Sequence, residues 1–400
     1  MTAAKNITVN DGDDPTPMQP VGEFKVKSRG SVDPRRFPDE LFELFSIPAY
    51  DSQNPEVLHG KEIGSSKKVV EPGDVLISRI VPHIQRVWVV GPSNGHRQIA
   101  SGEWLVFGHS DVDQEYLRYM LLSTPFHQQF LDTVAGMGGS LLRARPSEVE
   151  RIEIPVPKLL PEQQRIAAIL DKADAIRRKR EQVLTLADDF LKSTFLEMFG
   201  DPSENPKKYP VENFASILSI PLRNGISPSS RGTVLARVLT LTAITGDHFD
   251  EEQEKEGKFL VPISAKDTVN DSDFYICRGN GSPDLIGKGF YATQTIPGTA
   301  FPDTMIAAKP NPKQVTRAFL EGIWNSPFVR NQILEAARTT NGTFKINQTA
   351  AGAIKLPMPP MEAQKRFQTI VDQVRQSNEK LKFGDDLFPS LSQRAFNGEL

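Results

Sequence analysis

A long stretch without glycine decides the organisation of this chain. Residues 161–199 read PEQQRIAAILDKADAIRRKREQVLTLADDFLKSTFLEMF, and their one proline stands at the first position, where a helix tolerates it. Apolar residues recur in this stretch every seven positions, which is the repeat of a coiled-coil helix. A stretch near the C-terminus has the same repeat. The side chains expected at the seam between the two helices are Ile169, Ile176, Val183 and Phe190 in the first and Phe367, Val374, Leu381 and Phe388 in the second.

We expect these two helices to be partners in an antiparallel coiled coil. A helix of about 35 residues spans roughly 50 Å at about 1.5 Å per residue. This length exceeds the roughly 34–36 Å of one DNA turn. Gly384 and Pro389 predict a bend or an interruption in the second helix. Ordinary core packing is the alternative explanation for an apolar stripe on one helix.

The chain also repeats itself at a shift of about 200 residues. GDVLISR at 73–79 recurs as SDFYICR at 272–278, and IEIPVP at 152–157 recurs as IKLPMP at 354–359. Several matches in the same order indicate a tandem duplication. The others are Leu117, Leu121, Pro125 and Phe126 with Phe319, Ile323, Pro327 and Phe328; Gly139-Ser140 before Arg143 and Arg145 with Gly342-Thr343 before Lys345; and Gln163-Gln164-Arg165-Ile166 with Gln364-Lys365-Arg366-Phe367.

Each copy begins with short apolar runs broken by Gly, Pro, Asn and Asp, a pattern typical of strands and turns. Each also contains two probable helices, near 112–122 and 126–135 in the first copy. The sequence therefore predicts an α+β fold of two similar α/β domains separated by a pair of long antiparallel spacer helices. The expected boundaries are a flexible N-terminal arm at 1–20, domains at 21–157 and 201–359, and spacers at 158–200 and 360–400.

Composition narrows the possible functions. The 47 Lys and Arg against 50 Asp and Glu give a net charge of −3, so the chain has no bulk positive charge with which to bind phosphate. Its one cysteine, Cys277, excludes a disulfide framework and favours a reducing, cytoplasmic compartment. We expect no membrane span, because no apolar run approaches the roughly 18 residues required.

Catalytic signatures are missing from the sequence. The amino-methyltransferase motif does not occur, and its nearest string, residues 310–313, lacks the second proline and the aromatic residue. There is no phosphate-binding Walker loop, and the six histidines show no metal-ligand spacing. Residues 136–139 are rich in glycine and more typical of a turn. Asp74 and Asp273 lack a nearby lysine and partner carboxylate, so we expect them to accept hydrogen bonds in turns. We therefore predict no enzyme activity, cofactor or metal.

A nearly neutral chain can bind DNA through basic residues placed locally in loops. Lys would mainly hold phosphates, whereas Arg and Asn can also make paired hydrogen bonds to base edges. Any one of these residues could instead lie on a solvated surface or pair with an acid. The basic run at 177–180 (RRKR) could likewise be a solvated helix face, or it could contact the DNA backbone or an acidic patch of a partner. The candidates are Ser65, Ser66, Lys67, Lys68, Arg79, Arg86, Arg143 and Arg145 in the first domain and Arg231, Arg278, Asn280, Lys288 and Lys345 in the second.

Over nearly its whole length the sequence resembles the specificity subunits of type I restriction–modification enzymes. The most specific segments are IEIPVPKLLPEQQRIAAILDKAD at 152–174, FLKSTFLEMFGDP at 190–202 and the terminal SLSQRAFNGEL at 390–400. Gly102 departs from the pattern, which has a hydroxyl residue at this position.

This resemblance implies two target-recognition domains, each of which reads one half of a bipartite site in double-stranded DNA. It also implies that the spacer helices dock two S-adenosylmethionine-dependent adenine methyltransferase subunits, joined in the full enzyme by translocating restriction subunits. The residues alone leave open a scaffold that binds proteins and not DNA. The repeated basic loop favours the DNA-binding alternative.

Overall fold

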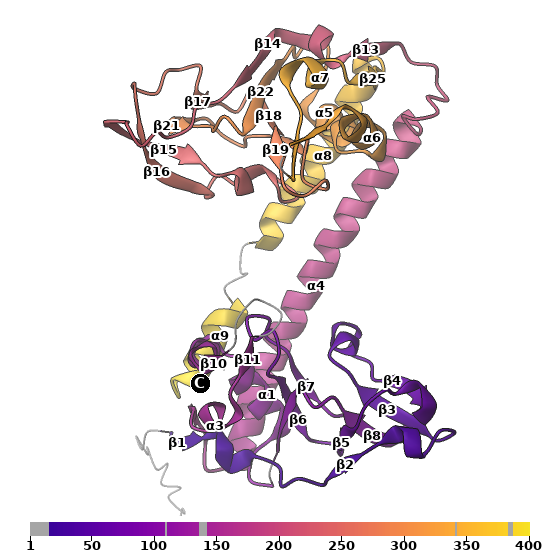
Figure 1. The fold of residues 1–400 in the computed structure, drawn as a ribbon, viewed down its shortest axis with the longest axis vertical. Coiled ribbons are helices and arrows are strands. Elements are labelled where there is room, and N and C mark those ends of the chain that lie inside the picture. The colour runs from indigo at the N-terminus through magenta and orange to yellow at the C-terminus, as the bar shows by residue number, and fades with distance from the viewer. Residues whose placement is uncertain (1–15, 109, 136–141, 341, 383–386) are drawn as a thin grey trace, which may run out of the picture. The chain divides into compact units, whose positions relative to one another are not determined.

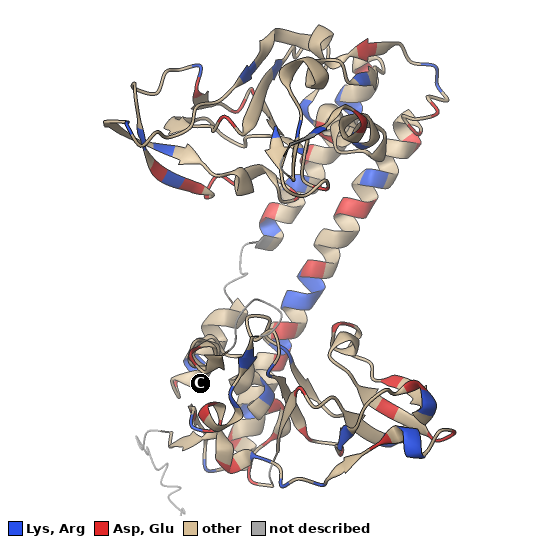
Figure 2. Ribbon diagram, in the orientation of Figure 1, with Lys and Arg blue, Asp and Glu red and all other residues tan. Residues whose placement is uncertain are grey.

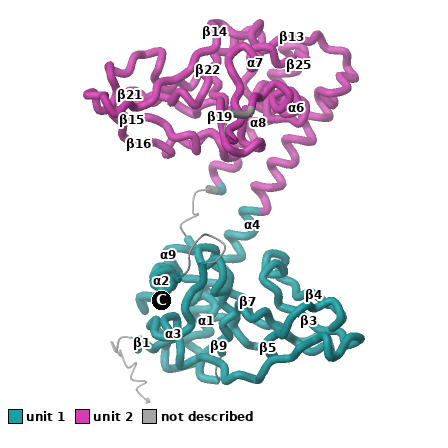
Figure 3. Tube along the Cα trace, in the orientation of Figure 1, with its two compact units in different colours: residues 1–181, 381–400 teal, residues 182–380 magenta. Residues whose placement is uncertain are grey.

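The computed structural model of the chain (Figure 1) describes residues 16–108, 110–135, 142–340, 342–382 and 387–400. The chain divides into two compact units, coloured separately in Figure 3. Unit 1 comprises residues 1–181 and 381–400, and unit 2 comprises residues 182–380. Each unit contains both sheets and helices, which confirms the predicted α+β class.

Unit 1 contains a five-stranded sheet in the order β2-β5-β8-β3-β4 and a three-stranded sheet in the order β7-β6-β9. In the larger sheet, β3 runs parallel to β8 and antiparallel to β4. The strands are β2 (Ser31–Val32), β3 (Leu41–Phe45), β4 (Glu56–His59), β5 (Lys67–Val69), β6 (Val75–Ser78), β7 (Val87–Val89), β8 (Arg97–Ala100) and β9 (Trp104–Phe107).

Unit 2 repeats this arrangement with a sheet in the order β16-β15-β21-β17 and another in the order β14-β22-β18-β20. Here β15 runs parallel to β21 and antiparallel to β16, as β3 does with β8 and β4. The internal repeat is therefore confirmed. The strands are β14 (Leu218–Asn224), β15 (Val234–Leu239), β16 (Glu254–Phe259), β17 (Thr268–Val269), β18 (Phe274–Cys277), β20 (Gly289–Tyr291), β21 (Ile296–Ala300) and β22 (Met305–Pro310).

Two helices follow the sheets in each unit, as predicted. The side chain of Asp113 caps the first of them in unit 1 by accepting hydrogen bonds from the backbone N–H groups of Glu115 and Tyr116. Thr316 caps the corresponding helix of unit 2. A short helix completes each unit, together with the pair β10-β11 in unit 1 and the three-stranded sheet β19-β24-β23 in unit 2. These elements are α1 (Gln114–Leu122), α2 (Thr124–Asp132), β10 (Val134–Ala135), β11 (Arg143–Ala144) and α3 (Pro146–Val149), and α5 (Arg317–Trp324), α6 (Pro327–Ala336), β19 (Gly279–Asn280), β23 (Arg338–Thr340), β24 (Thr343–Lys345) and α7 (Gln348–Gly352).

The first described residues belong to a strand. Residues 1–15 of the predicted flexible arm lie outside the described residues, but the prediction is wrong at the end of the arm. Strand β1 (Met18–Pro20) pairs antiparallel with β12 (Glu153–Pro155), and β13 (Val211–Asn213) pairs in the same way with β25 (Lys355–Pro357). Met18 is 47% exposed. Backbone hydrogen bonds therefore hold this strand, and the low apolar content of the segment did not indicate them.

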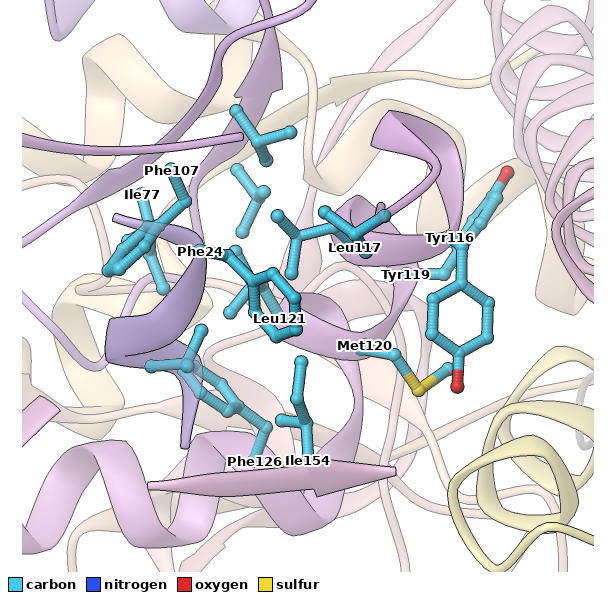
Figure 4. Close-up of a cluster of buried hydrophobic side chains, with 14 of the residues drawn as sticks. Phe24, Ile77, Phe107, Tyr116, Leu117, Tyr119, Met120, Leu121, Phe126 and Ile154 are labelled. Carbon is cyan, nitrogen blue, oxygen red and sulfur yellow. The ribbon is translucent and has the colours of Figure 1, made fainter. Parts of the chain in front are cut away.

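The core of unit 1 gathers around α1. Figure 4 shows Phe24 and Leu121 within a cluster that also contains residues of the three-stranded sheet. Tyr116 and Tyr119 are fully buried, and both hydroxyl groups find acceptors: Tyr116 Oη donates to the Pro155 carbonyl at 2.7 Å and Tyr119 Oη donates to an Asp171 carboxylate oxygen at 3.1 Å. These bonds tie α1 to the β12 strand and to the long helix.

A buried glutamine fastens the first long helix, α4 (Leu160–Phe199), to its domain. Gln163 is 1% exposed. Its Oε1 accepts a hydrogen bond from the Asp113 backbone N–H at 2.7 Å, and its Nε2 donates to the carbonyl groups of Pro157 at 2.8 Å and Asp111 at 3.1 Å. The glutamine thus joins the start of α4 to the start of α1.

Gln364 does the same in unit 2, near the start of α8 (Met361–Lys382). Its Oε1 accepts from the Thr316 backbone N–H at 3.0 Å, and its Nε2 donates to the carbonyl groups of Pro359 at 2.9 Å and Gln314 at 3.2 Å. The duplication therefore extends to individual hydrogen bonds.

The α4 helix contributes to the core of each unit at a different end. In unit 1, Ile166 and Leu170 pack in the core cluster that also includes Ala395 of α9 (Leu387–Phe396). In unit 2, Phe195 and Phe199 both meet the ring of Phe367 in α8, with centroids 5.5 Å apart. The beginning of α4 thus contacts the last helix of the chain, and its end contacts the beginning of α8, as an antiparallel arrangement requires.

The predicted seam is wrong for the middle of α4. Ile176 is 42%, Val183 45% and Phe190 53% exposed. The buried face passes through residues such as Ile166 and Ala173, three positions before the predicted ones, and three positions correspond to about 60° around a helix. A heptad repeat is compatible with either of these neighbouring stripes. Of the other seam residues, Phe367 is buried, and Ile169, Val374, Leu381 and Phe388 are half-buried.

The second spacer consists of two helices. The α8 helix ends at Lys382 and α9 begins at Leu387. Gly384 lies outside the described residues, and Pro389 stands in the first turn of α9, where its missing N–H would be unpaired in any case. Phe388 contacts the ring of Tyr119 at a centroid distance of 5.8 Å.

Charges of both signs alternate along α4 (Figure 2). The basic run at 177–180 pairs in part with acids of its own helix. Arg177 bridges Asp174 at 2.7 Å and Glu181 at 2.7 Å, and Arg178 lies 3.4 Å from Asp174. These contacts favour the explanation that the run is a solvated helix face.

Candidate nucleic-acid interface

An arginine follows an inner strand of the equivalent sheet in each unit, β6 in unit 1 and β18 in unit 2. Strands β6 and β18 are buried along their whole length, and Arg79 and Arg278 come directly after them. The Arg79 N–H donates to the Glu103 carbonyl at 3.0 Å, and its carbonyl accepts from the Ala144 N–H at 2.9 Å. These two backbone hydrogen bonds form the frame of Arg79, and the repeat places a basic side chain in the same frame in unit 2.

The frame of Arg278 has the same two bonds. Its N–H donates to the Thr304 carbonyl at 2.9 Å, and its carbonyl accepts from the Ile346 N–H at 2.9 Å. The side chain bonds differently, because Arg278 Nη1 donates to the backbone carbonyl of Asp303 at 3.0 Å. Strand β19 pairs with β24, which places Asn280 and Lys345 near Arg278.

In unit 1, two predicted arginines meet at one carboxylate. Arg79 Nε donates to Glu103 Oε2 at 3.0 Å, and Arg143 Nη2 donates to Glu103 Oε1 at 3.1 Å. Burial acts to raise the pKa of Glu103, but the hydrogen bonds from Arg143 and Arg79 outweigh it and lower the pKa. The carboxylate stays ionised and holds both guanidinium groups in place.

Lys68 lies beside this cluster. Its Nζ donates to the Trp104 carbonyl at 2.8 Å. Burial lowers the pKa of Lys68, and the positive charges of Arg79 and Lys25 lower it further. Lys67 Nζ instead bonds back to the hydroxyl group of Ser65 at 2.7 Å. Ser66, from the same predicted group, donates its hydroxyl to the Val32 carbonyl at 3.2 Å.

The two repeated aspartates are buried and paired with arginine. Arg29 Nη1 donates to Asp74 Oδ2 at 2.6 Å, and the Glu71 backbone N–H donates to the same oxygen at 2.9 Å. Arg223 bonds Asp273 in unit 2, where burial raises the pKa of the Asp273 carboxyl group against the attraction of Arg223. Asp74 is thus an N–H acceptor in a turn, as predicted, and its arginine partner was missed.

A basic cleft of about 590 Å³ occupies one side of unit 1. Lys68 and Arg79 line it, together with three residues that the sequence analysis missed: Lys25, Lys27 and Arg29. These three alternate along the chain, and in an extended segment every second side chain points to the same side. This alternation was the signal available in the sequence.

The remaining predicted residues lie apart from this cleft. Arg145 precedes α3 and is exposed, and Arg86 is half-buried. In unit 2, Arg231 is exposed near the β15–β16 hairpin, and Lys288 Nζ donates to the carbonyl groups of Thr245 and Gly246 at 3.0 Å each. Residues 136–141, which include the glycine-rich segment predicted to be a turn and the Gly139-Ser140 match of the repeat, lie outside the described residues.

Among the residues that the structure describes, no helix has the length and apolar character of a membrane span. Within the same residues, no group of three or more His, Cys, Asp or Glu side chains is arranged to hold a metal ion.

Comparison with known proteins identifies relatives of this chain. Residues 66–186 match the family model of the type I restriction modification DNA specificity domain. The specificity subunit of the type I restriction enzyme EcoKI from Escherichia coli K12 is 23% identical over 285 residues, which cover 66% of this chain and 61% of the relative. The StySPI specificity subunit of Salmonella potsdam is 21% identical over 311 residues, or 72% of this chain and 66% of the relative. The aligned parts thus span less than two thirds of each relative.

Solved structures share the fold. The S subunit of a type I restriction–modification system from M. genitalium is 12% identical with a TM-score of 0.57, and the match covers 98% of both chains. A chain from a structure of a type I restriction–modification system is 19% identical with a TM-score of 0.52, over 96% of this chain and 98% of the other. Residues 66–186 are therefore similar to the type I restriction modification DNA specificity domain, and the chain as a whole shares its fold with solved subunits of type I systems.

Proposed function

We propose that this chain is the non-catalytic specificity subunit of a type I restriction–modification system and that each unit reads one half of a bipartite site in double-stranded DNA. The observation that carries the proposal is the repeated pair of backbone hydrogen bonds at Arg79 and Arg278, because one chain then presents a basic side chain at the same position of two similar units. Two readers joined by a helix suit a target whose two parts are separated by a fixed number of base pairs.

The candidate residues divide into two roles. Lysines hold phosphates and set the position of the duplex, whereas arginine and asparagine side chains can also bond base edges. Arg145, Arg231 and Lys345 are exposed and thus available to a duplex without a change in the fold. Arg79 and Arg143 are held by Glu103, which orients their guanidinium groups.

The proposed partners are two adenine methyltransferase subunits that use S-adenosylmethionine, with translocating restriction subunits in the full complex. Val183, Leu186 and Phe190 form an apolar face on the part of α4 that belongs to unit 2, with exposed fractions of 45%, 67% and 53%. A helix face of this kind suits a protein partner. We place a methyltransferase contact on it.

Mapping methylated adenines tests the DNA-reading role. Genomic DNA from cells that make this chain with its methyltransferase partner is expected to carry methylated adenines in a two-part motif with a fixed gap. The motif should disappear when the chain is deleted and return when it is restored. A continuous short motif, or a motif that does not depend on this chain, would contradict the proposal and leave the protein scaffold as the explanation.

A substitution on α4 tests the docking face. Phe190→Asp is expected to weaken association with the methyltransferase subunits about 100-fold, because it places a charge at the centre of an apolar contact. The measurement is co-purification and titration of the subunits. Leu196→Asp is the matched control, since Leu196 is 52% exposed on the same helix but lies about 120° around it. An equal loss of association in both variants would show that this face of α4 is not the contact with the methyltransferase subunits.

A further inference from the structure

The cleft of unit 1 has an unusual charge. Its lining includes five basic residues and one acidic residue, Glu150. The volume of about 590 Å³ lies within the usual range of ligand-binding sites. The basic side chains come from two places, the segment 25–31 and the sheets, where Lys68 lies in the inner strand β5 and Arg79 follows the central strand β6. The fold therefore gathers positive charge that the composition of the chain does not show.

Some of these charges are partly neutralised. Lys25 Nζ lies 2.5 Å from Glu150, Arg29 bridges both Asp74 and Glu71, and Arg79 bonds Glu103. These acids hold the basic side chains around the cleft. Lys68, in contrast, donates to a neutral carbonyl group, and its ammonium group has two more N–H donors.

The floor of the cleft is rigid. Leu105 and Phe107 of β9 line it, and both belong to the core cluster of unit 1, in which Figure 4 shows Phe107. The Arg29–Asp74 pair fastens the segment 25–31 to the turn before β6. Arg29 and the segment that carries Lys25 and Lys27 are therefore held in place before any ligand arrives, which reduces the entropy lost on binding.

Unit 2 contains a cleft whose charges are balanced. This cleft of about 430 Å³ is lined by three basic residues and three acidic ones: Lys192, Lys288 and Arg330 with Asp188, Asp247 and Asp284. The segment that corresponds to 25–31 is β14, in which Arg223 is the one basic residue. Arg223 is committed to Asp273 and to the Lys266 carbonyl at 3.0 Å.

We infer that the basic cleft of unit 1 binds phosphodiester groups of the DNA backbone and that the two units contribute unequally to affinity. This inference rests on the proposed DNA-reading function and adds a division of labour to it. Unit 1 supplies much of the salt-dependent, sequence-independent binding through Lys25, Lys27 and Lys68. Unit 2 contributes less to this sequence-independent binding.

The test measures how the full chain binds a random-sequence 30-base-pair duplex between 50 and 200 mM salt. Each phosphate contact contributes about −0.9 to the slope of log K against log salt, so the double variant Lys27→Ala/Lys68→Ala should have a slope about 2 units shallower. Across this four-fold salt range, its binding should weaken about ten-fold less than that of the unaltered chain. Lys27→Arg/Lys68→Arg should restore the slope, because the charge returns.

Lys61→Ala is the matched control, an exposed lysine of the same unit that does not line the cleft. Thermal unfolding verifies that each variant is folded. If the double variant does not fold, the salt dependence is measured with Lys27→Ala alone. An unchanged slope in the cleft variant, the same change with Lys61→Ala, or no binding of random duplex by the unaltered chain would overturn the inference. Methylation mapping tests the proposed function independently of this inference. If the methylated motif depends on the chain, the proposed function stands even when the slope does not change.

Discussion

Removal of one turn from α4 is expected to change the gap in the DNA target while both half-sites remain the same. Deletion of Arg178–Glu181 shortens the helix by about 6 Å, which corresponds to about two base pairs. These residues suit the purpose because most of them are exposed, and the pair that Glu181 makes with Arg177 at 2.7 Å is a surface ion pair, which contributes little to stability. The same deletion in α8, at Gln376–Glu379, keeps the two spacers matched.

The measurement is the methylated motif in cells that make the deleted chain. A matched variant in which Arg178–Glu181 are all replaced by alanine keeps the length of the helix and should keep the original gap. If the deletion leaves the gap unchanged, α4 does not set the distance between the half-sites. If the alanine variant changes the gap, the side chains and not the helix length are responsible.

Replacement of the buried glutamine at the start of α4 is expected to have the largest effect on stability. Gln163→Ala leaves the Asp113 N–H and the carbonyl groups of Pro157 and Asp111 without their side-chain partner. Each buried unpaired group costs about 1–3 kcal/mol, so we expect a loss of about 3 kcal/mol in the free energy of unfolding. For a domain of this size, the Tm of unit 1 should fall by about 10 °C.

The neighbouring residue offers a control of the same chemistry. Gln164 is exposed, so Gln164→Ala should change the Tm very little. Gln364→Ala should lower the unfolding transition of unit 2 by a similar amount, because the three bonds of Gln364 correspond to those of Gln163. Calorimetry on the full chain measures both transitions. If Gln163→Ala and Gln164→Ala lowered the Tm equally, the buried hydrogen bonds of Gln163 would not be what holds α4 to unit 1.

Much of the fold could be predicted from local signals. The matched segments GDVLISR and SDFYICR became the equivalent strands β6 and β18, because a fully apolar run with a turn before it is enough to indicate a buried strand. The forty-residue helix α4 and the paired helices after each sheet followed from periodicity and from caps such as Asp113. These features depend on residues a few positions apart, so one sequence contains the information for them.

The candidate interface was predictable only in part. Arg79 and Arg143 were predicted from their charge. Their pairing with the same carboxylate was not, because Glu103 lies 24 positions from Arg79 and 40 positions from Arg143 in the sequence. The seam along Ile176, Val183 and Phe190 was placed on the wrong face, because a seven-residue repeat does not say which of two adjacent stripes a partner will cover.

By itself, the sequence determined the duplication, the α+β class, the long helix and the resemblance to specificity subunits, since all of these are patterns along the chain. Only the tertiary structure decided that Lys25, Lys27 and Arg29 share a cleft with Lys68 and Arg79, and that the cleft of unit 2 is lined by as many acidic as basic residues. The reason is physical. Charge acts through space, and a chain with nearly equal numbers of acids and bases becomes locally positive only where folding brings distant basic residues together.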